Sequence, residues 1–299
     1  MKLSSILKEM NVLSHEITED IEFETLALSE SSLENNFCTF LDNPKFIDNL
    51  SDNASIIITN KEISSHISNR ALCIVEEPRM LFFRIHNFLK DNLEYVRSNF
   101  KSIIKDNCKI SNLSSIASEN VIIGNNVVIE EFVVIRENTV IDDNCIIRAG
   151  SIIGGEGFEF KRDKKNYSIL EVKHLGGVVI EKNVEIQQNV CIDKAVYPWD
   201  NTIIGENSKL DNFIHVAHAV KIGKNVLIAA QTGFGGRTII KNDSWIGFAT
   251  TITNGIEIGE NANVNIGAVV TKKVNAGESV SGNFAIDHKK FIEFIKSIR

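Results

Sequence analysis

The most regular feature of the chain is a large aliphatic residue at every sixth position of its second half. The series opens with Ile123, Ile129, Ile135, Ile141, Ile147 and Ile153. It resumes at Ile180 and runs to Val270, with Pro198 as its one failure. A helix repeats every 3.6 residues and a strand every 2, so neither alone produces this series. The residues two positions earlier, from Val178 to Ala268, are nearly as restricted, being Val, Ile, Thr, Ser or Ala.

Glycine, asparagine and aspartate follow the large aliphatic residue in many hexads, as in Ile123–Asn126 and Ile222–Asn225. These residue types adopt tight-turn and left-handed conformations at low cost. Each hexad therefore predicts a short strand followed by a corner. Three such hexads make one triangular coil of a parallel β-helix, in which successive coils stack around a dry interior. An ordinary β-sandwich with this spacing by accident is the weaker alternative.

The two ends of the chain lack hexads and predict other structures. Residues 1–100 predict a small α/β domain, because two short apolar runs look like buried strands between segments of helical spacing. Its predicted elements are a helix over 1–13, strands over 54–59 and 71–75, and a helix over 79–100. The last segment, Ile286–Arg299, predicts a short amphipathic capping helix. The expected domains are thus 1–100, a β-helix over 101–283 and a helix over 284–299.

The hexads are interrupted between Ile153 and Ile180 by a segment too long for one corner. Long loops on rigid scaffolds are often functional. Its basic run, Lys161–Lys165, either meets phosphate groups of a carrier or nucleotide or belongs to an ordinary solvated loop. The sequence leaves both interpretations open.

The composition of the chain argues against several classes of protein. The 299 residues include 43% hydrophobic and 24% charged residues and carry a net charge of -7, which argues against nonspecific binding to nucleic acid or to an anionic membrane. No apolar run approaches the roughly 18 residues of a membrane span, and residues 1–15 lack a signal-peptide core. We expect a cytoplasmic protein. The five cysteines form no C-x-x-C pair, so no disulfide framework and no zinc site are expected.

The segment Lys209–Val220 places Asp211, His215 and His218 in adjacent hexads. His218 follows inward Val216 by two places, so we expect it at or near a corner, facing outward. A histidine of ordinary pKa can accept a proton from an attacking amine, although a simple surface histidine is the alternative. His215 and His218 are three residues apart and project from different faces of an extended chain, so a shared metal is not expected.

Residues 233–236, Gly-Phe-Gly-Gly, lie one coil beyond the histidines. Glycines let a backbone approach a ligand closely and expose N–H groups, as an oxyanion hole requires. Glycines at β-helix corners would show the same spacing. Both interpretations stay open on spacing alone.

Six segments of the chain resemble the UDP-3-O-acylglucosamine N-acyltransferases of lipid A synthesis, a family of hexapeptide-repeat acyltransferases. They are Ile153–Phe158, Lys209–Asn212, Ile214–His218 and Ala229–Gly233 in the repeats, and Phe40–Phe46 and Ala71–Pro78 in the first domain. Their order and spacing match, and the resemblance covers nearly all of the chain. It implies a left-handed parallel β-helix, against the usual right-handed crossover preference, and a homotrimer with sites at the subunit interfaces.

The resemblance also implies a reaction and its residues. A 3-hydroxyacyl group would move from an acyl carrier protein thioester to the amino group of a UDP-linked glucosamine derivative. His218 matches the general base, Asp211 a carboxylate that orients it, and the Gly236 N–H the oxyanion donor, while His215 would contact substrate. The acyl thioester is a co-substrate; no bound cofactor and no metal are expected.

The first-domain segment Phe-Leu-Asp-Asn-Pro-Lys-Phe resembles the family's F-L-x-N-P-K-[YF] motif. Phe40 and Phe46 match the aromatic residues on either side of uracil, and Asn43 the amide between them. Stacking of this kind contributes about 1 to 3 kcal/mol per base. Ordinary core packing is the alternative for both phenylalanines.

Two departures from the family concern the acyl donor. The family's second histidine matches Gly255, and the family's longer C-terminal helical extension has no counterpart before Arg299. A paralogue that acylates another UDP- or dTDP-linked amino sugar from an acyl-coenzyme A, for surface polysaccharide, is therefore the alternative. A noncatalytic β-helical scaffold is a third hypothesis.

Overall fold

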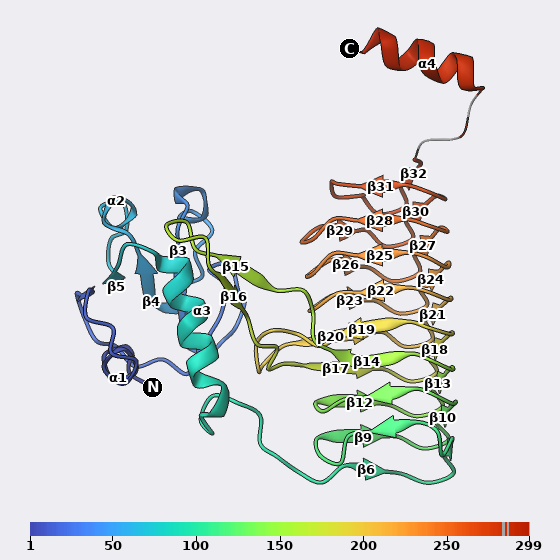
Figure 1. Cartoon of the computed structure of the whole chain (residues 1–299), viewed down its shortest axis with the longest axis horizontal. Coiled ribbons are helices and arrows are strands. Elements are labelled where there is room, and N and C mark those ends of the chain that lie inside the picture. Colours follow the sequence, from blue (N-terminus) through green and yellow to red (C-terminus); the bar gives the residue numbers. More distant parts are fainter. Residues whose placement is uncertain (283–284, 286, 299) are drawn as a thin grey trace. The chain divides into compact units, whose positions relative to one another are not determined.

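The computed structural model describes residues 1–282, 285 and 287–298. The chain forms two compact units, shown by the ribbon in Figure 1. The first unit contains Met1–Asn99, Phe158–Gly176 and Val196–Asp200, and the second contains Phe100–Gly157, Gly177–Ala195 and the residues from Asn201 onward. The first unit thus takes in two segments beyond residues 1–100. The expected boundary at 283/284 and the expected helix ends Ile286 and Arg299 lie outside the described residues.

The first unit is built on a mostly parallel sheet with strand order β1-β5-β4-β3-β2. Its strands are β1 (Glu16–Ile17), β2 (Thr25–Leu26), β3 (Phe37–Leu41), β4 (Ala54–Thr59) and β5 (Ala71–Ile74), and only β1 runs antiparallel. Its helices are α1 (Leu3–Glu9), α2 (Lys61–Ser64) and α3 (Pro78–Phe88), with 3₁₀ turns η1 (Pro44–Phe46) and η2 (Leu89–Asp91). The predicted α/β domain and its two strands are confirmed.

The predicted helix over 79–100 is wrong in its second half. Helix α3 ends at Phe88, and Asn92 starts a turn in which its side chain accepts a hydrogen bond from the Glu94 N–H at 2.8 Å. Asparagine competes with helical hydrogen bonding in this way. Leu93 is consequently exposed rather than part of an apolar helix face.

The predicted loop after Ile153 contains a hairpin and joins the first unit. Strands β15 (Phe160–Arg162) and β16 (Ile169–Glu171) pair antiparallel. The Asp163 carboxylate accepts hydrogen bonds from the N–H groups of Lys165 and Asn166 and so shapes the turn. The turn residues are polar, and the flanking alternation, Phe-Glu-Phe-Lys at residues 158–161, is too short to predict a strand from the sequence.

The second unit is a parallel β-helix with three sheets, here called faces 1, 2 and 3 in the order in which the chain visits them. Face 1 holds β6 (Ile103–Ile104), β9 (Val121–Ile123), β12 (Thr139–Ile141), β17 (Gly177–Ile180), β20 (Asn201–Ile204), β23 (Lys221–Ile222), β26 (Ile239–Ile240) and β29 (Glu257–Ile258). Face 2 holds β7 (Lys109–Ile110), β10 (Val128–Ile129), β13 (Ile146–Ile147), β18 (Glu185–Ile186), β21 (Lys209–Leu210), β24 (Leu227–Ile228), β27 (Trp245–Ile246), β30 (Asn263–Val264) and β32 (Ser279–Val280). Face 3 holds β8 (Ser115–Ile116), β11 (Val134–Ile135), β14 (Ile152–Gly155), β19 (Cys191–Asp193), β22 (His215–Val216), β25 (Gly233–Phe234), β28 (Thr251–Ile252) and β31 (Val269–Val270).

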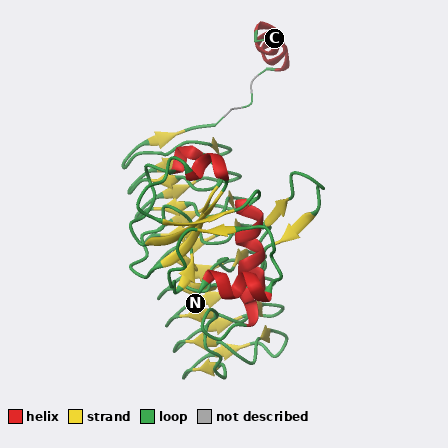
Figure 2. Cartoon of the chain, turned by 90° about the vertical axis from the view of Figure 1, so that its left-hand side faces the viewer, coloured by secondary structure: helices red, strands yellow, loops and turns green. Residues whose placement is uncertain are grey.

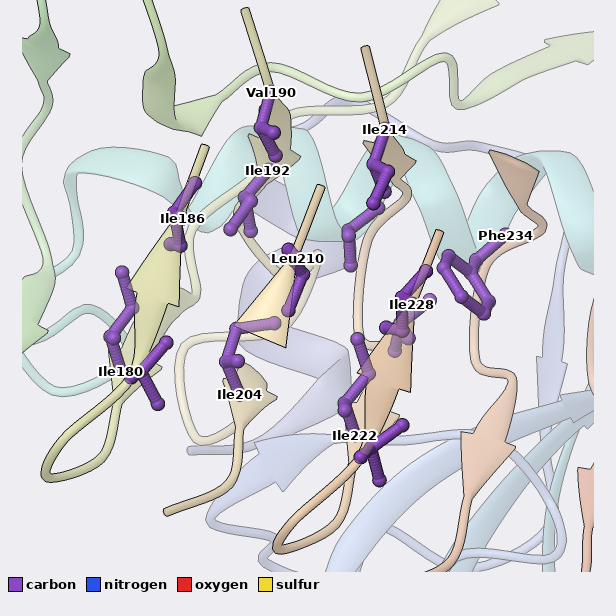
Figure 3. Close-up of a cluster of buried hydrophobic side chains, with 14 of the residues drawn as sticks. Ile180, Ile186, Val190, Ile192, Ile204, Leu210, Ile214, Ile222, Ile228 and Phe234 are labelled. Atoms are coloured by element: carbon purple, nitrogen blue, oxygen red, sulfur yellow. The ribbon is translucent and has the colours of Figure 1, made fainter. Parts of the chain in front are cut away.

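The predicted inward columns form the core of this β-helix. The aliphatic column is almost fully buried from Ile123 to Val270, and the column two residues earlier is buried over most of its length. Figure 3 shows side chains from the three faces together, among them Ile204 of face 1, Leu210 of face 2 and Phe234 of face 3. Burying one such side chain contributes about 1.5 to 3 kcal/mol. The fold prediction is confirmed, including the C-terminal helix α4 (His288–Ser297).

The hexad that contains Pro198 is not part of a coil, so its inclusion in the series was wrong. Ile129 pairs with Ile147, the usual step, whereas Ile192 pairs with Val216, one hexad further on. The extra residues belong to the first unit. Proline has no N–H with which to hydrogen-bond a neighbouring strand. The step is longer by six residues, so the six-residue period of the sequence continues through the segment.

One coil precedes the first predicted hexad. Strands β6, β7 and β8 stack on β9, β10 and β11, and Ile104 pairs with Ile123. This step is one residue longer than the usual coil, so Ile104 and Ile110 fall out of the frame that starts at Ile123. Ile104 is half-exposed because this coil ends the stack.

The corners between faces 1 and 2 use asparagine and glycine for different reasons. Asn207 and Asn225 have φ of 63° and 57°, and the Asn207 side chain donates to that of Asn225 at 3.2 Å. Gly205 and Gly259 are not left-handed; a Cβ there would lie 2.4 and 2.3 Å from the backbone of the next coil. Asparagine therefore makes the corner, and glycine allows the coils to approach.

Helices are absent from the coils themselves, which consist of strands and turns in the described part of the chain (Figure 2). A search of the described residues finds no helix with the length and apolarity needed to cross a membrane.

Candidate functional site

The corner between faces 3 and 1, here the 3–1 corner, departs from asparagine at three consecutive coils. Its left-handed residues there are Ala219, Arg237 and Gly255, with φ of 59°, 61° and 71°. Earlier coils have Asn120 and Asn138 at this corner. Left-handed backbone in an ordinary residue costs about 1 to 3 kcal/mol and gathers at functional sites. The 3–1 corner is also where the chain leaves the β-helix for both segments of the first unit.

His218 lies at this corner, immediately before Ala219. The expected position at a corner is thus the one that it occupies, and the residue is buried, with 7% of it accessible. Its ring lies against Gly236 in the next coil, where an added Cβ would be 2.5 Å from His218 Nε2. Gly236 is not left-handed, so glycine is needed there for the imidazole and not for the corner. The predicted base and the predicted oxyanion donor are therefore neighbours across two coils.

His215 projects outward from β22 and is paired with an aspartate that the sequence did not single out. Its Nε2 lies 3.0 Å from Oδ2 of Asp193, and the side chain of Asp193 is 10% exposed while that of His215 is 55% exposed. The hydrogen bond to the carboxylate holds the pKa of His215 above its ordinary value, and burial opposes this. Cys191, in the same strand as Asp193, pairs in register with His215. The usual eighteen-residue step back from His215 does not lead to the coil of Asp193, because the hexad that contains Pro198 lengthens this step. The sequence period therefore did not predict the pair.

The Asp211 carboxylate is hydrogen-bonded around its own corner of the coil. Its Oδ1 accepts hydrogen bonds from the N–H and side-chain amide of Asn212, and its Oδ2 accepts one from the N–H of Ala230 at 3.2 Å. Asp211 lies at the corner between faces 2 and 3, whereas His218 lies at the 3–1 corner, so one whole face separates them. The orienting role that the resemblance implies for Asp211 therefore stays a prediction.

The outer surface beside His215 is open in the next coil. Gly233 pairs in register with His215, and an added Cβ at Gly233 would meet nothing within 4 Å. Its φ is not left-handed, so the backbone does not require glycine here. Gly255, the position that departs from the family's second histidine, also has no neighbour within 4 Å, but its left-handed φ accounts for glycine.

The candidate nucleotide residues belong to the first unit. The Phe40 ring in β3 packs on Phe82 and Phe83 of α3, with centroids 4.9 and 5.8 Å apart, and is partly buried against the core. The Asn43 side chain accepts a hydrogen bond from the Lys45 N–H and caps η1. Phe46 is 42% exposed. Asn43 and Phe46 follow the carboxyl end of the parallel strand β3, and open α/β sheets bind ligands at such ends.

A cavity of about 220 Å³ opens at the same edge of the sheet. Its lining includes the basic residues Arg79, Lys161, Arg162 and Lys164 and the acidic residues Asp42, Glu76 and Glu77. Three residues of the basic run of the hairpin thus line the cavity, and the Lys161 ammonium among them is paired with Glu159.

Comparisons with known proteins find similarity to acyltransferases in the repeats. The family described as bacterial transferase hexapeptide (six repeats) matches residues 120–155 and 201–236. A UDP-3-O-acylglucosamine N-acyltransferase of Caulobacter sp. (strain K31) is 37% identical over 134 residues, which cover 45% of this chain and 38% of that protein. One from Wolinella succinogenes is 29% identical over 151 residues, covering 50% and 46%. The chain thus spans less than half the length of these relatives.

A solved structure shares the fold. The UDP-N-acetylglucosamine acyltransferase from Campylobacter jejuni matches with a TM-score of 0.51 and 19% identity, over 66% of this chain and 81% of that one. The hexapeptide-repeat β-helix and the predicted resemblance to the N-acyltransferases are therefore confirmed.

Proposed function

We propose that the chain is an N-acyltransferase that moves a 3-hydroxyacyl group from an acyl carrier protein thioester to the amino group of a UDP-linked glucosamine derivative, as in lipid A synthesis. The observation that carries the proposal is the packing of His218 against Gly236 at the 3–1 corner. The similarity of the repeats to named N-acyltransferases supports the reaction class.

In the proposed reaction the amine nitrogen attacks the thioester carbonyl, and His218 accepts the proton that the nitrogen loses. The carbonyl oxygen becomes an oxyanion, to which the Gly236 N–H donates a hydrogen bond. The C–S bond then breaks, and the thiolate takes the proton from the imidazolium. A C–N bond has replaced a C–S bond, and His218 is neutral again. Thioesters are reactive enough for positioning and one base to suffice.

The Asp193–His215 pair would bind the acceptor beside this base. The charged carboxylate keeps His215 able to donate a hydrogen bond from the ring. The open surface at Gly233 leaves room for a sugar next to it.

In the first unit, the exposed ring of Phe46 would stack on the uracil while Phe40 supports the strand from the core. Arg162 and Lys164, in the cavity at the same sheet edge, offer positive charge to the phosphates of the nucleotide.

A homotrimer is part of the proposal. The corner between faces 2 and 3 carries exposed apolar side chains along the stack, namely Leu113, Phe132, Phe213, Phe248 and Ile266. Phe132 and Phe213 are left-handed, with φ of 60° and 57°, a strained conformation for bulky residues. An apolar edge of this length is typical of an interaction surface. Sedimentation at several concentrations tests the trimer, and a monomer throughout would contradict it.

The open space at Gly255 favours a second candidate function. In it the chain still acylates an amino sugar, but with a different acyl donor or a different sugar. Gly255 has no side chain with which to hold a carrier-linked acyl group. An acyl-coenzyme A donor and a UDP- or dTDP-linked amino sugar that is not O-acylated define this alternative.

One assay distinguishes the candidates. Purified protein is mixed with either 3-hydroxyacyl carrier protein or a short acyl-coenzyme A, and with either UDP-3-O-acylglucosamine or an unacylated UDP- or dTDP-amino sugar. Thiol release that needs the carrier protein and UDP-3-O-acylglucosamine is the result that the first proposal expects. Release only from coenzyme A with an unacylated sugar supports the second, and no release with any pair contradicts both.

A further inference from the structure

We infer that Thr202 is a positioning residue that ties the support of His215 to the corner that bears His218. The inference rests on the proposed function for its catalytic consequence, but its structural part concerns the free protein. Thr202 is fully buried in β20, on the inward side of face 1.

The Thr202 hydroxyl makes two hydrogen bonds to the backbone on either side of the site. It donates to the carbonyl oxygen of Asp193 at 2.6 Å and accepts from the N–H of Ala219 at 2.8 Å. Asp193 holds His215 through its carboxylate, and Ala219 directly follows His218. One buried hydroxyl therefore touches the segments that fix both histidines.

The neighbouring coils show why a side chain is needed here. At the same corner, the N–H of Arg237 donates to the carbonyl of His218, and that of Gly255 donates to the carbonyl of Gly236. Each left-handed residue is thus bonded to the coil before it. The coil before Ala219 leaves the β-helix at residues 196–200. Its backbone does not supply the equivalent acceptor, and the Thr202 hydroxyl takes that role.

The backbone strain at Ala219 makes its hydrogen bond to the Thr202 hydroxyl important for the shape of the corner. Ala219 has φ of 59°, a conformation that persists only when its surroundings hold it. Without the hydroxyl, the Ala219 N–H loses this acceptor and the corner is free to relax. A displacement of about 1 Å at a catalytic group can lower turnover about 100-fold, so a relaxed corner would act through His218.

Other buried hydroxyls of the β-helix provide a matched control. Thr250 is also fully buried, and its hydroxyl donates to the carbonyl of Gly247 at 2.7 Å, within its own coil. Valine has nearly the shape of threonine and already occupies both columns, at Val178 beside Thr202 and at Val190 on face 3. Thr202→Val and Thr250→Val therefore remove equivalent hydroxyls, of which one touches the site.

The test compares Thr202→Val, Thr202→Ser and Thr250→Val with the unaltered protein. Two readouts are used: NMR titration of the His215 ring in the free protein, and kcat and KM for acyl transfer. The groups that titrate around His215 are Asp193 and Cys191, and all four proteins retain both.

We expect Thr202→Val to change both the His215 titration and the kinetics: kcat should fall by about tenfold or more, and KM for the sugar should rise because His215 binds the acceptor in the proposed function. Thr202→Ser should restore both, and Thr250→Val should lower Tm without changing either. The inference is overturned if Thr202→Val behaves like Thr250→Val in the titration. If no protein transfers acyl groups, the proposed function fails, and the titration still decides the role of Thr202.

Discussion

Single residues at the 3–1 corner are held by contacts between stacked coils, and such contacts decide which residue types fit. The glycine at 236 is fixed by the imidazole of the preceding coil, and Asp193 is fixed by the histidine of the next. His218 and Gly236 were predictable because resemblance named them. Asp193 was not, because the excursion at residues 196–200 lengthens the step between its coil and that of His215.

Adding one methyl group at Gly236 should move the His218 ring. A Cβ there would overlap Nε2, so Gly236→Ala should lower kcat by about 10²-fold or more while the protein stays folded. Thermal melting checks folding, and Gly233→Ala serves as the stability control because its Cβ meets nothing. Turnover of Gly236→Ala equal to that of the unaltered protein would show that the contact has no role.

Replacing Asp193 by asparagine should lower the pKa of His215, because the carboxylate is what raises it. A raised native pKa stabilises the fold at low pH, and this contribution disappears as pH rises above it. The free energy of unfolding should thus differ between the two proteins more at about pH 5.5 than at about pH 8.5. NMR titration and urea unfolding measure the two effects. An equal difference at both pH values contradicts the assignment of the pair.

At the scale of elements, strands with a buried column were predictable and departures from the frame were not. Ile222 lies in a hexad whose period fixes the buried side, and Ile57 lies in a continuous apolar run that is buried on both faces of its sheet. The first coil is one residue longer than the usual eighteen, so its residues leave the six-residue period and the sequence does not predict it. The Pro198 segment adds six residues, so it keeps the period and looks like part of a coil. The end of α3 and the hairpin β15–β16 depend on polar turn residues, which carry no periodic signal.

The asparagine corners give a prediction for one element. Asn225 has φ of 57°, a left-handed conformation that asparagine tolerates through the hydrogen bonds of its short polar side chain and that alanine does not, so Asn225→Ala should cost about 1 to 2 kcal/mol of unfolding free energy. Asn225→Gly should cost less, because glycine adopts this conformation freely. Urea unfolding of the three proteins should order them as asparagine, glycine, alanine from most to least stable. Alanine as stable as glycine would argue against a conformational cost at this corner.

At the scale of the whole molecule, the first unit carries a buried titratable network of its own. His86 is fully buried; its Nε2 donates to the carbonyl of Lys173 at 2.8 Å, and its Nδ1 therefore accepts from the Tyr95 hydroxyl at 2.7 Å. Both ring nitrogens are used by the neutral imidazole. Burial lowers the pKa of His86 to about 4. The hairpin segment, which supplies Lys173, is thus bound to α3 within the first unit.

Acid should accordingly weaken the first unit. The unfolded chain binds a proton at His86 near pH 6.5, before the folded chain does, so about 3 kcal/mol of stability is lost between pH 6.5 and about 4. The measurement is guanidinium unfolding followed by the fluorescence of Trp199, which lies in the first unit, in a Trp245→Phe background. His86→Gln should flatten the dependence. A dependence unchanged by His86→Gln would assign the acid effect elsewhere.

The central claim is that His218 accepts the proton of the acceptor amine. The most direct test is the mass of the sugar product after reaction with 3-hydroxyacyl carrier protein, compared among the unaltered protein, His218→Ala and the control His66→Ala, whose histidine lies in the first unit. The account predicts the acyl mass increment for the first and third proteins, and a rate about 10²- to 10⁴-fold lower for His218→Ala, with sugar-nucleotide binding retained. Equal rates of product formation in all three proteins would contradict it.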